Sequence, residues 1–111
     1  MAVAAKKDVM GIINPEEMMS KAEEACDFMK ALSTSTRLML LCSLMDGERT
    51  VTELAEMVGA KQSLTSHHLN RLKLSGIVSA RRDEKFIYYS LGNTVARDIV
   101  EILYREFCKP D

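Results

Sequence analysis

Residues 50–90 limit the possible folds of this chain more than any other stretch. Thr50 and Glu53 form a T-x-x-E capping box, which predicts that a helix begins there, and Gly59 is the expected end of that helix. After a tight turn, a second helix is predicted from about Gln62 to Ser75. Two helices joined by a short turn, the second of them polar on its exposed side, suit insertion into a DNA major groove.

The two sides of this second helix differ in polarity. Leu69 and Leu72 mark its inward side, and Gly76 closes it where a left-handed residue is commonly needed. On the outward side, polar residues of the N-terminal half should face base edges or nearby phosphates, and a basic residue further on should contact phosphate. A polar face that is only solvated is the alternative for a helix pair taken alone. The residues predicted to contact DNA from this helix are Gln62, Ser63, Ser66, His67 and Arg71.

The sequence after Gly76 predicts a β-hairpin with a charged tip. Residues 77–80 lead into the run RRDEK, and Phe86 to Leu91 return with aromatic and β-branched residues. A two-stranded ribbon with a basic tip directly after a recognition helix is a wing, so the two elements together predict a winged helix-turn-helix. We expect its basic residues to contact the DNA backbone or the minor groove, with a solvated tip as the alternative. These residues are Arg81, Arg82 and Lys85.

Charge is distributed unevenly along the chain. The net charge of the 111 residues is only −1, which does not by itself indicate a nucleic-acid-binding protein. Residues 61–85, however, contain six basic and two acidic side chains, so this reading element carries a net charge of +4. Positive charge concentrated on the proposed reading element is the electrostatic pattern expected of DNA binding.

The rest of the sequence predicts three more helices and a loose N-terminal arm over residues 1–14. Asn14 and Pro15 are typical of a helix start. The predicted fold is mainly α (α+β), with five helices and a two-stranded wing in the order α-α-α-α-β-β-α, in which residues 15–111 form one domain. The additional helices are predicted over residues 15–32, 36–45 and 94–107. The expected inward residues of the middle one are Leu38, Leu41, Cys42 and Met45.

Several classes of protein are excluded by what the sequence lacks. It has no apolar run of membrane-spanning length, and its first 14 residues lack the long apolar region and A-x-A site of a secretory signal. We therefore expect a cytoplasmic protein whose thiols rest mostly reduced. No Cys–His–acid arrangement and no Gly-rich phosphate loop is legible, so we expect neither an enzyme nor a bound cofactor.

Residues 33–93 resemble the ArsR/SmtB family of bacterial dimeric repressors. The matching runs are STSTRLMLLCSLMDGE, TVTELAEMVG and SLTSHHLNRLKLSGIVSARRDEKFIYYSL, followed by the closing helix. The resemblance implies a homodimer formed through the first and last helices, although the residues alone also permit packing of these helices within one subunit. It implies double-stranded operator DNA with an inverted repeat as partner, because two-fold symmetry lets two recognition helices meet half-sites about one DNA turn apart.

The resemblance also suggests two metal sites, and this sequence matches neither. One family site uses cysteines in the first helix of the reading unit, where this chain has Thr50 and Thr52, and hydroxyls do not replace thiolates for soft metals. The other uses Asp and His pairs on the last helix, which here contains Asp98 but no His. His67 and His68 are adjacent on the recognition helix and point about 100° apart, so they make a poor chelate. We expect His68 to pack structurally and predict no metal site.

The cysteines resemble those of one sensing branch of the family. Cys42 in the predicted second helix and Cys108 near the C-terminus match the pair of the BigR/SqrR-like repressors, which sense persulfides and redox state. This resemblance implies that reactive sulfur species join Cys42 to Cys108 through a disulfide or polysulfide bridge and so release DNA. Cys26 does not match the pair and is expected to be structural or a side reactant. Cysteines acting only as small buried apolar residues are the alternative.

Two further functions stay open at the level of sequence. The three cysteines Cys26, Cys42 and Cys108 could instead form a thiolate site for a thiophilic ion such as arsenic(III), as in an ArsR-type metalloregulator. A winged helix that binds protein rather than DNA is the other possibility. Stoichiometric binding of such an ion, accompanied by thiolate absorption, would indicate the metalloregulator. Absence of a gel shift with promoter DNA would indicate the protein-binding winged helix.

Overall fold

The computed structural model describes residues 14–108, and the chain divides into two compact units, residues 1–30 and 31–111. Apart from Asn14, the expected N-terminal arm lies outside the described residues. The expectation that a single domain begins at residue 15 stays a prediction. Between Asn14 and Cys108, no helix combines the length and the apolar character that crossing a bilayer requires.

Helix α2 (Pro15–Leu32) supplies most of the described part of the first unit. It starts as predicted, because Asn14 Oδ1 accepts a hydrogen bond of 2.8 Å from the backbone N–H of Glu17, and two glutamates lie in its first turn. Acidic side chains there interact favourably with the positive end of the helix dipole. The methionines Met18, Met19 and Met29 of α2 are exposed, whereas Leu32 at its end is buried.

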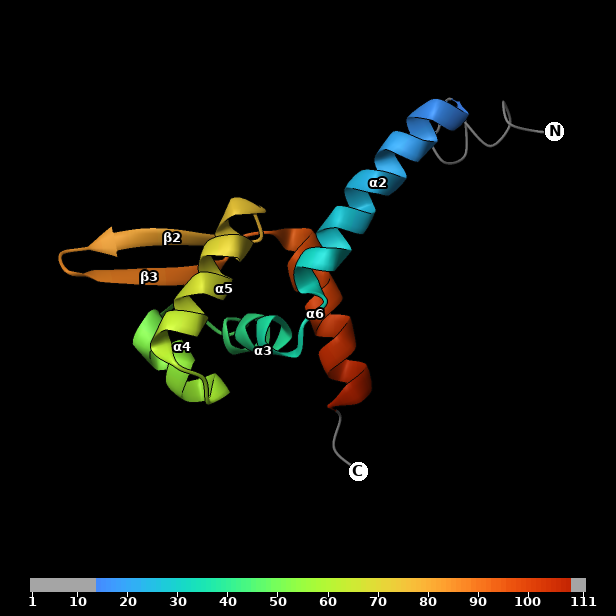
Figure 1. The fold of residues 1–111 in the computed structure, drawn as a ribbon. Helices are drawn as coiled ribbons and strands as arrows, with labels where there is room; N and C mark the ends of the chain where they lie inside the picture. Colours follow the sequence, from blue (N-terminus) through green and yellow to red (C-terminus); the bar gives the residue numbers. More distant parts are fainter. Residues whose placement is uncertain (1–13, 109–111) are drawn as a thin grey trace. The chain divides into compact units, whose positions relative to one another are not determined.

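The second unit contains four helices and a small sheet (Figure 1). The predicted winged helix-turn-helix with five helices and a hairpin wing is confirmed. The elements are α3 (Ser35–Ser43), β1 (Arg49–Thr50), α4 (Val51–Val58), α5 (Gln62–Leu74), β2 (Val78–Asp83), β3 (Phe86–Leu91) and α6 (Thr94–Phe107). Every helix of this unit contributes to one core, whose largest fully buried apolar side chains are Leu40, Leu41, Leu44, Leu54, Leu69, Leu72, Ile77 and Val100.

The sheet has one strand more than the sequence predicts. Arg49 pairs with Tyr89 and Thr50 with Tyr88, both antiparallel, so β1 joins the wing in a three-stranded sheet of order β1-β3-β2. A strand of two residues has no period of its own to detect, since alternation needs about four residues or more. The sheet fastens the start of α4 to the central strand of the wing.

Helix α3 ends earlier and packs on a different side than predicted. It stops at Ser43 instead of Met45, and the chain then turns with the N–H of Met45 bonded to the carbonyl of Cys42 at 3.2 Å. Its buried side consists of Leu40, Leu41 and Leu44, whereas Leu38 and Cys42 are only half-buried. Because apolar residues occur almost all around this helix, periodicity alone did not identify the side that contacts the core.

The ends of α4 and α5 form as their residues predict. The backbone N–H of Thr50 donates to Glu53 Oε1 at 2.8 Å, and the N–H of Glu53 donates back to Thr50 Oγ1 at 3.3 Å. Gly59 and Gly76 follow the two helices with φ of 69° and 75°, a region that favours glycine. Local residue choice therefore sets where α4 begins and where both helices of the reading unit end.

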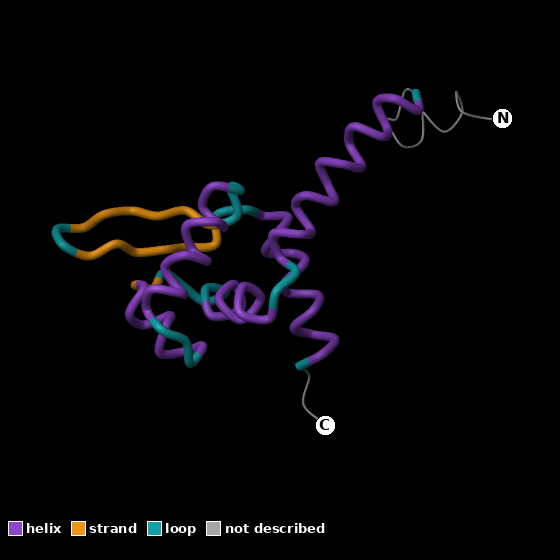
Figure 2. The backbone as a smooth tube through the Cα atoms, viewed as in Figure 1, coloured by secondary structure: helices purple, strands orange, loops and turns teal. Residues whose placement is uncertain are grey.

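The wing is a regular hairpin that projects away from the helices of its unit (Figure 2). Its register runs from Val78 opposite Leu91 to Asp83 opposite Phe86, which leaves Glu84 and Lys85 as a two-residue turn. Glu84 has φ of 58°, the one positive φ at a non-glycine residue among residues 14–108. The base of the hairpin is buried, and its tip is exposed.

Candidate functional site

The outward side of α5 carries the residues predicted to contact DNA. Ser63, Ser66, His67 and Arg71 are all exposed, while Thr65, Leu69 and Leu72 face the core. Gln62 is exposed as well, but its Nε2 donates a hydrogen bond of 2.8 Å to Thr52 Oγ1 and so ties the start of α5 to α4. We call the exposed side of α5 together with the wing the reading surface.

Two further residues of α5 lie outside the set predicted to contact DNA. Asn70 is exposed and follows Ser63 and Ser66 at spacings of seven and four, so helical geometry puts it on the same face as these two serines. Its spacing in the sequence already places it on the outward side of the helix. Thr65 is fully buried, and its hydroxyl donates to the carbonyl of Lys61 at 2.9 Å, which secures the first turn of α5. Burial of a threonine has no clear sequence signal.

The two histidines differ in environment as the sequence suggests. His67 is exposed on the reading surface, whereas His68 is half-buried and its Nδ1 has no hydrogen-bond partner among residues 14–108. Burial lowers the pKa of the His68 imidazole, and the nearby positive charge of Arg37 lowers it further. His68 is therefore a neutral packing residue near pH 7.

The basic residues of the wing lie on opposite faces of the hairpin. In a strand, successive side chains alternate between faces, so Arg81 shares its face with Tyr88, and Arg82 shares the other with Ile87. Arg81 donates from Nε and Nη2 to the two carboxylate oxygens of Glu48 at 2.8 and 2.9 Å, and its guanidinium carbon lies 4.7 Å from the centre of the Tyr88 ring. This hydrogen bond from Arg81 lowers the pKa of the Glu48 carboxyl.

Arg82 and Lys85 are less constrained. Arg82 Nε donates to the carbonyl of Glu84 at 3.1 Å, and Lys85 Nζ lies 5.7 Å from the centre of the Phe86 ring. Neither residue forms an ion pair with any acidic side chain of residues 14–108. Their charges are therefore free to meet a phosphate, whereas the charge of Arg81 is already offset by Glu48.

Cys42 and Cys108 line a single apolar pocket between α3 and α6. The pocket has a volume of about 530 Å³. Cys42 is half-buried in its wall, and Cys108 is exposed just after the last turn of α6, where its N–H donates to the carbonyl of Tyr104 at 2.8 Å. Burial raises the pKa of the Cys42 thiol above 9.0, and the Cys108 thiol nearby raises it further. We call this hollow the thiol pocket, and its other lining residues are Leu38, Met39, Ser43, Val100, Leu103, Tyr104 and Phe107.

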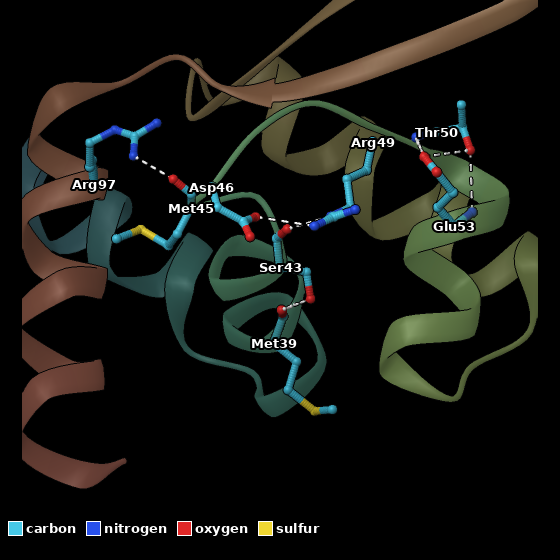
Figure 3. A network of polar contacts seen from close by, with 8 residues as sticks. All are labelled: Met39, Ser43, Met45, Asp46, Arg49, Thr50, Glu53 and Arg97. Carbon is cyan, nitrogen blue, oxygen red and sulfur yellow. Dashed lines mark hydrogen bonds and ion pairs between the residues drawn. The ribbon is translucent and has the colours of Figure 1, made fainter. Parts of the chain in front are cut away.

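Two arginines hold the turn that follows Cys42 (Figure 3). Arg97 of α6 donates to the carbonyl of Met45 at 3.0 Å and to the carbonyl of Leu91, at the end of β3, at 3.4 Å. Arg49 of β1 donates to the carbonyl of Ser43 at 3.0 Å and pairs with Asp46 at 3.2 Å. The end of α3 is thus bonded to α6 on one side and, on the other, to the strand that leads directly into α4.

Cys26 is an exposed thiol on α2. Within residues 14–108, no group of three or more His, Cys, Asp or Glu side chains is arranged to hold a metal ion. The three-cysteine thiolate site considered from the sequence stays an alternative.

Comparison with known proteins extends this description. The sequence profile described as "Bacterial regulatory protein, arsR family" matches residues 34–80. The biofilm growth-associated repressor of Xylella fastidiosa is 42% identical over 93 residues, which cover 84% of this chain and 82% of that protein. The crystal structure of the transcriptional repressor BigR from Xylella fastidiosa matches with a TM-score of 0.76 and 40% identity, over 87% of this chain and 99% of that one. Reduced HlyU from Vibrio cholerae matches with a TM-score of 0.80 and 33% identity, over 85% and 99%.

Proposed function

This chain belongs to the ArsR family of bacterial transcriptional regulators, and we propose that it is a homodimeric repressor whose operator is an inverted repeat. It releases this operator when reactive sulfur species join Cys42 to Cys108. The observation that carries the proposal is that both thiols line one pocket between α3, which packs in the core of the DNA-binding unit, and α6.

The reading surface supports the DNA-binding part of the proposal. Side chains from the N-terminal half of α5 contact base edges or adjacent phosphates, and Arg71 contacts phosphate. Arg82 and Lys85 contact the DNA backbone from the wing, because their charges are not offset within the described chain. Arg81 can contact DNA in one of two ways: its guanidinium keeps the hydrogen bonds to Glu48 and also contacts DNA, or it breaks those hydrogen bonds first.

Exposed apolar side chains support a dimer. On α6, Val95 and Ile102 are 56% and 52% exposed and lie seven residues apart, on one side of the helix, with half-buried Ile99 between them. Such a stripe on a helix of a small domain is stabilised by burial against a partner. The exposed methionines of α2 offer a second apolar surface of the same kind.

The two thiols differ in the step that suits each of them. Cys108 is exposed and makes the first attack on the sulfur reagent, while the half-buried Cys42 resolves the intermediate. Because burial raises the folded-state pKa of Cys42, its thiolate fraction at any pH below that pKa is smaller than that of an ordinary cysteine. The rate of ring closure should therefore keep rising with pH beyond the ordinary thiol pKa before it levels off, whereas an attack led by Cys42 would show this dependence in the first step instead.

The two arginines provide a route from the bridge to the reading surface. A covalent bond between Cys42 and Cys108 changes how the end of α3 lies against α6. That end is bonded through Arg49 to the strand preceding α4 and through Arg97 to the end of β3, so both the helix pair and the wing respond. Release of DNA then follows from a change in the spacing of the two recognition helices of the dimer.

The test compares DNA binding and protein mass on the same samples. We expect the reduced protein to bind its own promoter DNA, and inorganic polysulfide to add sulfur mass minus two protons and abolish binding. The Ser variants C42S and C108S should bind DNA equally well and no longer release it, while C26S should behave as wild type. Release by polysulfide in C42S or C108S would contradict the switch, and absence of binding by the reduced protein would contradict the repressor function.

A further inference from the structure

We infer that the thiol pocket selects uncharged, apolar organic polysulfides over anionic persulfides and polysulfides. This inference rests on the proposed function, because it assigns a class of reagent to the same two thiols. Its basis is the chemistry of the side chains that surround Cys42.

The lining of the thiol pocket offers no cationic side chain to an anion. Besides the two thiols it consists of aliphatic, aromatic and thioether side chains with one serine and one tyrosine, and it includes no Lys, Arg or His. A carboxylate or a polysulfide anion entering it would lose hydration without gaining a cationic partner, which is costly. An alkyl chain would instead bury apolar surface, and a volume of about 530 Å³ is within the range of small-molecule sites.

A second hollow beside Cys42 adds negative charge. It has a volume of about 350 Å³ and shares Cys42, Ser43 and Tyr104 with the thiol pocket. Its wall contains Asp46 and Glu101. Arg49 offsets Asp46, but Glu101 forms no ion pair with a basic residue of the described chain, residues 14–108. Both approaches to Cys42 therefore disfavour anions, one through desolvation and the other through repulsion.

The reaction with a dialkyl trisulfide balances without any further oxidant. The Cys108 thiolate attacks the central sulfur of R–S–S–S–R, a sulfur–sulfur bond breaks, and one thiolate RS⁻ leaves. The Cys42 thiolate then attacks the same sulfur, and the second RS⁻ leaves. The two cysteines become a Cys42–S–Cys108 trisulfide, the reagent is reduced to two molecules of RSH, and the two cysteine protons end on those products.

The test uses two reagents with the same trisulfide core and different charge, dipropyl trisulfide and glutathione trisulfide. Intact-mass kinetics on the full chain measure formation of the bridged product, which gains one sulfur and loses two protons. The reaction of Cys26 in the C42S/C108S variant provides the reference, because Cys26 is an exposed thiol outside the pocket. Each bridging rate is divided by the rate at which the same reagent modifies Cys26. After this division we expect the rate with dipropyl trisulfide to exceed the rate with glutathione trisulfide by at least about tenfold, or about 1.4 kcal/mol.

A matched pair of variants isolates the charge. Glu101 and Glu106 are both exposed on α6, but only Glu101 lines the hollow beside Cys42. We expect E101Q to raise the rate with glutathione trisulfide about twofold to threefold at low salt, and E106Q to leave it unchanged. Tyr104→Lys, which adds a cation to both hollows, should raise that rate further.

The outcomes separate the two proposals. Equal corrected rates for the two trisulfides, or a faster reaction with glutathione trisulfide, would overturn the selection while leaving the thiol switch intact. If neither reagent bridges Cys42 to Cys108 and inorganic polysulfide also fails, the switch itself is wrong and the selection falls with it. Equal effects of E101Q and E106Q would remove the role assigned to the acidic hollow.

Discussion

The reading surface and the thiol pocket belong to the same unit but are built in opposite ways. Most side chains of the reading surface are exposed, and its charges either meet solvent or, for Arg81, an exposed partner. The thiol pocket is apolar, and one of its two thiols is half-buried. Binding to a polyanion needs accessible charges at fixed positions, whereas apolar, partly buried surroundings raise the pKa of a thiol.

This difference has a consequence for stability and for coupling. Changes on the reading surface should alter DNA affinity with little effect on folding, while changes around the thiol pocket affect the core directly. Helix α3 packs directly against α4 and α5, and the guanidinium groups of Arg49 and Arg97 add hydrogen bonds at its end.

The largest effect is expected from a core residue of α3. Leu40 is fully buried on the helix that carries Cys42, so Leu40→Ala should lower the free energy of unfolding by about 2–5 kcal/mol. Ser66→Ala on the reading surface should change it by less than about 0.5 kcal/mol. Urea denaturation of both variants measures the difference. Similar losses in the two variants would remove the contrast between the regions.

Arg82→Ala should weaken DNA binding by about tenfold, or about 1.4 kcal/mol, for every DNA sequence. It should also reduce the slope of log affinity against log salt by about 0.9, because one phosphate contact is lost. Arg81→Ala should change this slope less, since Glu48 already offsets the charge of Arg81. Fluorescence anisotropy across a salt series measures both. A loss confined to one operator sequence would show that Arg82 reads bases instead.

Arg97→Met should weaken the link between the thiol pocket and the wing. The variant loses its hydrogen bonds to the carbonyls of Met45 and Leu91. The coupling free energy, obtained from the ratio of the DNA affinities of the reduced and the bridged protein, should therefore fall by about 1 kcal/mol. The reduced protein should bind DNA nearly as wild type does. An unchanged ratio would mean that the signal passes elsewhere, and Arg49→Met would then be the next variant to measure.

The smallest effect is expected from Glu48→Gln, because its ion pair with Arg81 is exposed and screened by salt. The folded-state pKa of Glu48 is lowered, so its stabilising contribution is present above its ordinary value of 4.5 and is lost as pH falls through the lower folded value. Melting temperatures at low salt should differ slightly between wild type and E48Q near pH 7. The difference should vanish in acid, and one that persists there would point to a cause other than the ion pair.

Local signals predicted the helix-turn-helix and the wing well. The Thr50–Glu53 capping box and the left-handed glycine at Gly76 act over three to five residues, so the sequence contains all the partners they need. Strand alternation also contained the information that Arg81 and Arg82 face opposite ways. Strand alternation cannot reveal that Arg81 forms an ion pair with Glu48, which lies 33 residues away in the sequence.

Hydrogen bonds between near neighbours and the helical period fix the helices of the reading unit, the start of α4, the ends of both helices and the exposed face of α5, so these could be predicted from the residues alone. Three features could not be predicted in this way: which side of α3 is buried, the pairing of β1 with the wing and the presence of Cys42 and Cys108 in one pocket. Those features depend on contacts between residues tens of positions apart. Their energies come from packing and burial, which no local pattern of residues encodes.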